Sequence, residues 1–173
     1  MKKDINSLSR FPESNIFHSP EIYKVYKKTS NYNPGLIIVR SDIGEIEGIL
    51  LYRLQSYSRL LSYFTTRSIV VGGPLVRSSS HKSEVTRKIF EIYESRIPGN
   101  VLFTEIRNLW EDNNRQKVMK KLGYDSKEHI NYIINLSVGQ KNLWKNLNKK
   151  RRNGIRRSIR EEVTIATNFD LDL

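Results

Sequence analysis

The chain has 173 residues, which is enough for one ordinary domain or for one lobe of a larger protein. It has no cysteine, which excludes a small module built on disulfides, and its hydrophobic content of 38% can fill a single core. The net charge is +12, but it falls to +4 outside residues 145–160, so the signal for an anionic partner is local. No apolar run exceeds four residues, and no apolar stretch follows the basic N-terminus, so we expect a cytoplasmic protein without a membrane span.

The first half of the chain is predicted to form a helix and three strands. The Ser-Pro-Glu sequence at 19–21 is a typical helix start, with a capping hydroxyl, a proline at the first position and an acid near the positive end, and it predicts a helix over 20–29. Strands are predicted over 36–40, 47–55 and 62–71, with a turn at 42–44 between the first two.

In the second half, helices alternate with strands. The Gly72-Gly73-Pro74 sequence ends the third strand, and a serine-rich stretch at 78–80 opens a helix with apolar residues at helical spacing. A strand over 100–106, a helix over 111–122 that ends at Gly123, and a long strand over 124–136 follow. This order predicts an α/β fold, a mixed sheet with helices on both faces, as in acyltransferases of the GNAT type.

The positive charge is concentrated near the C-terminal end. Eight of the 16 residues from Lys145 to Arg160 are basic and none is acidic. As one helix over 143–160, this segment places five apolar residues on one half of the wheel and seven of the eight basic residues on the other, with Arg151 inside the apolar arc. Such a face is either solvated or binds a polyanionic partner, namely RNA, DNA, a phosphorylated substrate or an anionic membrane surface. The membrane is the least favoured of these, because the apolar half of the helix is needed for the core.

Several motifs occur in the order of one known family. The chain resembles the Fem-type peptidoglycan-bridge aminoacyltransferases and their GNAT-like relatives. The motifs that carry the resemblance are Ile16-Phe17-His18-Ser19-Pro20, Gly73-Pro74-Leu75-Val76, Glu105-Ile106-Arg107-Asn108, Leu122-Gly123-Tyr124, the Leu143-Trp144 pair, and Arg152-Asn153-Gly154-Ile155-Arg156-Arg157-Ser158 before Val163-Thr164-Ile165.

The resemblance implies one half of a tandem protein of two GNAT-like lobes. On this basis residues 1–140 form an N-terminal lobe, 141–161 a basic connecting helix, and 162–173 the start of a second lobe, with a new strand beginning at 163–166. The family transfers an acyl or aminoacyl group to an amine. The resemblance alone therefore implies an acyl donor, aminoacyl-tRNA or acyl-CoA, and a second lobe or another copy of the chain as partner.

The loop after the third strand departs from the family pattern. It has Gly72 where the Fem enzymes typically have an arginine, and Arg77 where they have an aspartate. The pyrophosphate-binding signature of GNAT enzymes is also absent from 72–83, so the sequence does not support a coenzyme A site and leaves the cofactor undefined.

The candidate site residues fall in three places. Glu105 and Arg107 alternate along a strand, so Glu105 can deprotonate an amine while Arg107 holds an anion, or the two form an ion pair. Gly72 and Gly73 either let a ligand approach the backbone or form a tight turn. The third place is the basic helix, where Arg151, Arg152 and Arg156 are the candidates for binding phosphates, as in RNA.

Other chemistry finds little support in the sequence. His18, His81 and His129 lack the spacing of metal ligands, so we predict no metal site. The function predicted first is an acyl or aminoacyl transferase lobe, inactive if this fragment lacks half of its cleft. Two alternatives stay open, a nonenzymatic nucleic-acid-binding module that uses the basic helix and a pseudoenzyme scaffold half.

Overall fold

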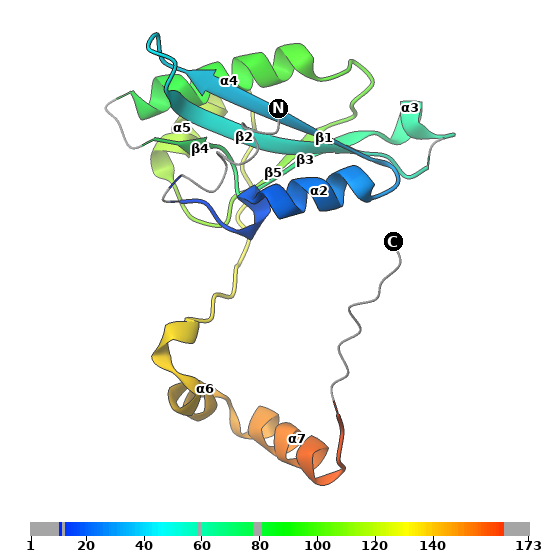
Figure 1. Cartoon of the computed structure of the whole chain (residues 1–173), viewed down its shortest axis with the longest axis vertical. Helices are drawn as coiled ribbons and strands as arrows, with labels where there is room; N and C mark the ends of the chain where they lie inside the picture. The colour runs from blue at the N-terminus through cyan, green and yellow to red at the C-terminus, as the bar shows by residue number, and fades with distance from the viewer. Residues whose placement is uncertain (1–10, 12, 59, 78–80, 165–173) are drawn as a thin grey trace. The chain divides into compact units, whose positions relative to one another are not determined.

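The computed structural model describes residues 11, 13–58, 60–77 and 81–164. The chain forms two compact units, residues 1–128 and residues 129–173. The first unit is a sheet covered by helices on both faces, and the second consists of short helices (Figure 1). The boundary lies after Glu128, and the predicted lobe over 1–140 stays a prediction.

The N-terminal part of the first unit forms a helix and a hairpin. The 3-10 turn η2 (Ile16–His18) leads into α2 (Pro20–Lys28), and the predicted cap is confirmed because Ser19 Oγ accepts the Ile22 N–H at 3.2 Å. Strands β1 (Tyr32–Arg40) and β2 (Ile46–Gln55) pair antiparallel. β1 begins before the predicted 36, and it accommodates Pro34 because it lies at the edge of the sheet.

The remaining strands complete a mixed sheet. β3 (Arg67–Val71) and β4 (Leu75–Val76) both pair antiparallel with β2, while β5 (Thr104–Arg107) pairs parallel with β3. The order is β1-β2-β3-β5, with β4 also on β2. The helices α4 (Lys82–Arg96) and α5 (Asn113–Lys121) flank β5 in the chain, and Gly123 ends α5 with φ of +84° as predicted.

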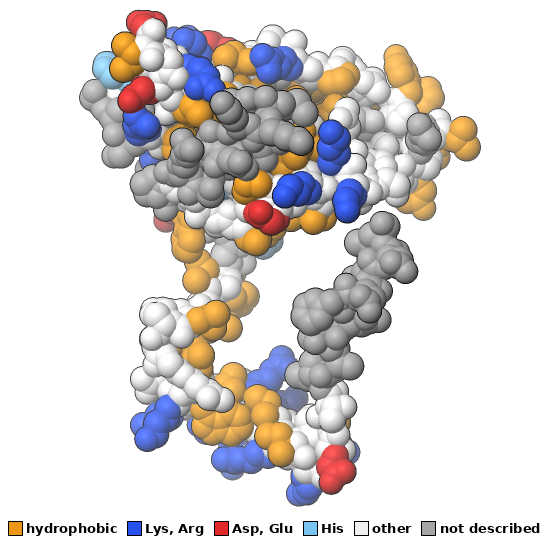
Figure 2. Space-filling view, viewed as in Figure 1, with side chains coloured by type: hydrophobic (Ala, Val, Ile, Leu, Met, Phe, Trp, Pro, Cys, Tyr) orange, Lys and Arg blue, Asp and Glu red, His pale blue; other side chains and the backbone are white. Residues whose placement is uncertain are grey.

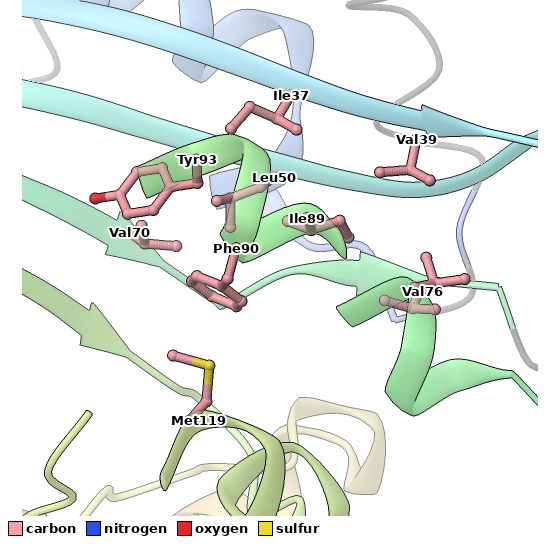
Figure 3. Packing of buried hydrophobic residues seen from close by; sticks show 10 residues of the cluster. Ile37, Val39, Leu50, Val70, Val76, Ile89, Phe90, Tyr93 and Met119 are labelled. Atoms are coloured by element: carbon pink, nitrogen blue, oxygen red, sulfur yellow. The ribbon is translucent and has the colours of Figure 1, made fainter. Parts of the chain in front are cut away.

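Two hydrophobic clusters fill the two faces of the sheet. On the face of α4 and α5, Ile89, Phe90 and Tyr93 of α4 pack over strand residues such as Leu50 and Val70 (Figure 3). On the other face, two tyrosines of α2 pack over the alternate strand residues, among them Ile49 and Leu51. The predicted mixed sheet with helices on both faces is thereby confirmed.

The predicted third strand over 62–71 is wrong in its first half. Residues Ser62–Thr65 form the short helix α3, and β3 begins only at Arg67. The hydroxyls of Thr65 and Thr66 donate back to the carbonyls of Leu61 and Ser62. Such bonds satisfy one helical turn locally, and they compete with strand pairing. The next predicted strand, over 100–106, is also shifted, because β5 covers Thr104–Arg107.

The predicted strand over 124–136 is wrong as well. Residues 124–135 form no strand, and the apolar side chains of Ile130, Tyr132 and Ile134 are exposed. A strand needs a neighbour for its backbone groups, and the described part of the chain pairs none with this segment. Alternation of apolar residues alone therefore did not decide the structure here.

In the second unit, two separate helices replace the single basic helix that the sequence predicted. It contains η3 (Leu136–Val138), α6 (Gln140–Asn146) and α7 (Lys149–Arg160). The single helix over 143–160 is wrong because Asn148 adopts an extended conformation and caps α7, its Oδ1 accepting the Arg151 N–H at 2.9 Å. The predicted strand at 163–166 lies partly outside the described residues.

Candidate functional site at the carboxyl end of the parallel strands

The parallel strands β3 and β5 end together, beside the glycine turn. Their register pairs Ile69 with Glu105 and Val71 with Arg107. The next residue, Gly72, donates its N–H to the carbonyl of Arg107 at 2.9 Å. Three of the predicted site residues, Gly72, Glu105 and Arg107, are thus brought together. In α/β folds, ligands often bind at the carboxyl ends of strands.

The two glycines of the turn have positive φ and close neighbours. Gly72 has φ of +86° and Gly73 has φ of +72°, a region that glycine adopts at little cost. A Cβ on Gly72 would overlap with the imidazole of His18, and one on Gly73 would lie 2.7 Å from Asn108 Oδ1 and from Arg115 Nη1. Side chains of the protein therefore fill the space in front of both glycines, where a phosphate would otherwise approach the backbone.

A cluster of charged side chains lies next to the turn. Arg115 of α5 is only 8% exposed, and its Nη2 lies 3.4 Å from Glu13 Oε2 and 3.5 Å from Asp112 Oδ2. Lys82, the first residue of α4, has its Nζ 3.1 Å from Glu13 Oε1 and 3.4 Å from Asp112 Oδ2. Two carboxylates and two cations thus join α4, α5 and the segment before α2.

The charges of the cluster keep the carboxylate of Asp112 ionised. Burial alone would raise the pKa of Asp112, but the backbone N–H and the charge of Arg115, with the ammonium of Lys82, together lower that pKa. Asp112 also caps α5, since its Oδ1 accepts the Arg115 N–H at 3.0 Å. The carboxylate is therefore ionised at neutral pH and acts as a structural anchor.

His18 lies buried between this cluster and the glycine turn. It is 1% exposed, and its Nε2 lies 3.1 Å from the carbonyl oxygen of Gly73, so Nε2 donates and Nδ1 carries the lone pair. Among the described residues, Nδ1 has no hydrogen-bond partner. Burial lowers the pKa of His18 from its ordinary 6.5, and the nearby Arg115 lowers it further, while the bond to Gly73 opposes both. The imidazole is therefore neutral at pH 7.

Glu105 and Arg107 form an ion pair on the α2 face of the sheet. Thr104 and Ile106 contact residues of the α4 face, so Glu105 and Arg107 project to the α2 face. Arg107 Nε donates to Glu105 Oε1 at 2.7 Å, and both side chains are partly exposed. This hydrogen bond lowers the pKa of Glu105 and raises that of Arg107. Both groups are charged at neutral pH.

Two more arginines surround the Glu105 carboxylate. The charges of Arg67 and Arg53 also lower the pKa of Glu105. The guanidinium of Arg53 lies 4.6 Å from the ring centre of Tyr26 and 5.1 Å from that of Tyr32, so two cation–π contacts hold it. One carboxylate among three guanidiniums gives this part of the sheet a cationic surface that suits an anionic ligand.

The arginines predicted to bind phosphates lie in the second unit, on α7. Arg151 and Arg156 are exposed, and Arg152 is half-buried and donates to the carbonyl of Lys145 at 3.3 Å. The guanidinium of Arg156 lies 5.6 Å from the ring centre of Trp144 on α6. Among the described residues, Arg157, paired with Glu161, is the one basic residue of α7 with an acidic partner.

The structure thus adds residues that the sequence did not single out. His18 appeared there only as part of a motif and as a rejected metal ligand, and the charged cluster of Glu13, Lys82, Asp112 and Arg115 was not predicted. The signal available in the sequence was weak, because these residues are separated by up to 102 positions. Within the described residues, no group of three or more His, Asp or Glu side chains is arranged to hold a metal ion.

Comparisons with known proteins reveal the fold. No family model matches the chain, and no curated protein matches its sequence. Solved structures do match. A probable acetyltransferase superposes with a TM-score of 0.53 at 12% identity, over 78% of this chain and 91% of that one. The ribosomal-protein-alanine N-acetyltransferase of Brucella melitensis biovar Abortus 2308 gives 0.50 at 9% identity, over 78% and 93%. The chain therefore has a GNAT-like fold.

Among the residues that the structure describes, none of the helices combines the length and the apolar character needed to cross a membrane.

Proposed function

We propose that this chain is a lobe of a cytoplasmic acyl or aminoacyl transferase that transfers an acyl group to an amine. The observation that carries the proposal is the GNAT-like sheet, in which the parallel β3–β5 pair ends beside Glu105, Arg107 and the glycine turn. The match to a solved acetyltransferase at 12% identity shows a similar fold and not a shared activity. The proposed transfer activity therefore rests also on the chemistry of these residues. The tandem arrangement with a second lobe, or with another copy of the chain, belongs to the same proposal.

Glu105 binds the acceptor amine in this proposal. An amine acceptor arrives as an ammonium, and the ionised carboxylate of Glu105 attracts it. Because hydrogen bonding from Arg107 lowers the pKa of Glu105, the carboxylate is a weak base, and it orients the amine more than it stores the proton. The ammonium first loses one proton to water, and the amine nitrogen then attacks the carbonyl carbon of the donor. The bond from that carbon to the donor oxygen or sulfur breaks, and the second proton of the nitrogen leaves with that group.

The anionic part of the donor is assigned to the arginines. Arg107, with Arg53 and Arg67, offers a cationic surface on the α2 face of the first unit. Arg151, Arg152 and Arg156 offer a second one on α7, suited to the phosphates of an aminoacyl-tRNA. Gly72 and Gly73 form the turn after β3, and Gly72 donates its N–H to the carbonyl of Arg107 at the end of β5. The sequence of this loop lacks the pyrophosphate-binding signature of GNAT enzymes, and we assign a coenzyme A pyrophosphate no step.

The proposal is tested with Glu105→Gln, which keeps the shape of the side chain and removes its charge. Purified protein is incubated with aminoacyl-tRNA or acetyl-CoA and a panel of primary amines, and products are identified by mass spectrometry. We expect the variant to lose at least about tenfold in kcat/KM. Glu91→Gln, at an exposed ion pair on α4, is the matched control. Equal activity of Glu105→Gln and the parent chain overturns the role of Glu105.

The dependence on a second lobe has its own experiment. Activity that appears only in a longer protein with a second lobe, or only in an oligomer, supports the half-cleft proposal. Absence of transfer with every donor and acceptor, in the short and the longer protein, favours a pseudoenzyme scaffold instead.

A second candidate function, a nonenzymatic nucleic-acid-binding module, is favoured by α7. Its basic residues are mostly exposed, and all but Arg157 lack an acidic partner among the described residues. Charge reversal at Arg152 and Arg156 should weaken RNA binding and reduce the slope of log K against log salt by roughly 0.7 for each lost contact to a single strand. Arg87→Glu on α4 is the control. Unchanged binding by the reversed variant contradicts this candidate.

A further inference from the structure

The first unit carries an exposed apolar patch at the end of the sheet where β3 and β5 begin. Figure 2 shows hydrophobic side chains gathered at this end, where α3 lies in Figure 1. Leu60 is 96% exposed and Phe64 is 70% exposed. We define the apolar patch by six residues, Leu60, Leu61, Tyr63, Phe64, Leu102 and Phe103. Clustered side chains of this size on a surface are uncommon, and they mark interaction sites.

The backbone beneath the apolar patch is well tied to the sheet. Leu102 donates its N–H to the carbonyl of Thr66 at 2.9 Å, and Asn100 Nδ2 donates to the carbonyl of Tyr63 at 3.4 Å. The rings of Tyr63 and Phe64 contact each other edge to face, with centroids 5.0 Å apart. These bonds hold α3 and the segment before β5 together, so the apolar side chains are presented as one surface.

Basic residues outnumber acidic ones around the apolar patch. The sequence contains no Asp or Glu from residue 48 to residue 83. Arg67 lies two residues after the end of α3, and Lys27 and Lys28 lie in the last turn of α2. That turn is close by, because Asn31 Nδ2 donates to the carbonyl of Tyr57 at 3.4 Å. Glu105 follows Phe103 by two positions and pairs with Arg107, so the basic residues near the patch outnumber this acid and the described surroundings carry a net positive charge.

We propose that the apolar patch docks the protein on the surface of an anionic lipid bilayer. Exposed Leu, Phe and Tyr side chains enter the boundary between headgroups and acyl chains, while Lys and Arg around them attract anionic headgroups. A second copy of this chain fits less well, because it carries a net charge of +12 and presents the same cations. The inference concerns a surface away from the glycine turn and goes beyond the proposed transfer reaction.

The experiment is cosedimentation of the full chain with vesicles of phosphatidylcholine, with and without phosphatidylglycerol. We expect binding to the anionic vesicles, and about tenfold weaker partitioning of the double variant Leu60→Ser, Phe64→Ser, because two apolar side chains are lost. Both side chains are exposed, so the melting temperature should not change. The single variant Leu60→Ser, with a smaller loss in the same direction, replaces the double variant if that one does not fold.

Matched controls separate this proposal from its rivals. The variant Ile16→Ser, Ile43→Ser removes two exposed apolar side chains outside the apolar patch and should bind as the parent chain does. If the reversed charges of Arg152 and Arg156 abolish vesicle binding while the patch variant retains it, α7 binds the lipid and the proposal is overturned. A dimer in sedimentation velocity that Phe64→Ser disperses also overturns it. Because sedimentation needs no substrate, failure of the transfer reaction leaves this test intact.

Discussion

The imidazole of His18 and the carbonyl of Gly73, 3.1 Å apart, connect the segment before α2 to the turn after β3. The two residues are 55 positions apart in the chain. On the other side of the same turn, Arg115 and Asn108 lie next to the Gly73 Cα. The turn is thus held from both sides by polar side chains, of which His18 and Arg115 are buried.

Substitution of Gly72 by alanine should destabilise the first unit by about 2–4 kcal/mol. The residue has φ of +86°, which is unfavourable for alanine, and the new methyl group would overlap with the ring of His18. The free energy of unfolding is measured by urea titration. Gly99→Ala is the control, because no atom lies within 4 Å of its Cβ position, and it should change stability by less than about 0.5 kcal/mol. Equal effects of the two variants would contradict the packing seen at the turn.

The buried His18 should make stability depend on pH. Its pKa is lower in the folded chain than the ordinary 6.5, so below this value the unfolded chain binds more protons. The contribution to stability is therefore complete above pH 6.5 and is lost as the pH falls from there through the folded pKa. His18→Gln should flatten the loss of unfolding free energy between pH 7 and pH 5. An equally steep loss in the variant means that another group causes it.

Replacement of Arg115 by methionine should cost about 2 kcal/mol. The change removes a buried guanidinium and leaves the carboxylates of Glu13 and Asp112 with Lys82 as their cation. The expected loss is below the ~3–5 kcal/mol of a fully buried pair because both carboxylates are partly exposed.

The control for this prediction is Arg87→Met. Its partner Glu91 lies one turn further along α4 in an exposed i,i+4 pair, and the change should cost about 0.5 kcal/mol or less. Thermal unfolding of both variants gives the comparison. If Arg115→Met is as stable as the control variant, the charged cluster contributes nothing beyond a surface pair.

Tyr93→Phe should lower stability by about 1 kcal/mol. The hydroxyl of Tyr93 donates to Ser68 Oγ at 2.5 Å and lies 3.0 Å from Thr104 Oγ1, so it joins α4 to both parallel strands. Tyr132→Phe, at an exposed position, is the control and should have no effect. A double-mutant cycle with Ser68→Ala measures the coupling, and a coupling energy of zero would show that this hydrogen bond does not stabilise the fold.

Local patterns predicted α2 and α5 well, and they failed at α3, at the basic helix and at the strand boundaries. The capping sequence before α2 and the glycine after α5 were correct because caps depend on residues a few positions apart. The segments at 62–65 and 124–135 were wrong because a strand depends on an edge to pair with, and apolar alternation does not supply one. The basic helix was divided by a single capping residue, Asn148, inside a strong helical pattern.

The candidate site was predicted in part. Glu105 and Arg107 could be placed on one face of a strand by counting, since alternate residues share a face, and the structure pairs them at 2.7 Å. Counting along the chain could not find the buried His18, or Arg115 with its carboxylates. Their contacts join segments that lie far apart in the sequence.

Composition and short-range pattern predicted by themselves an α/β core, the cap that begins α2, the glycine that ends α5 and a local concentration of positive charge, because each depends on residues close together in the chain. The pairing of strands, the burial of His18 against the glycine turn and the gathering of the apolar patch around α3 depended on folding. These features arise from contacts between distant segments, which only the packing of the whole chain brings into reach.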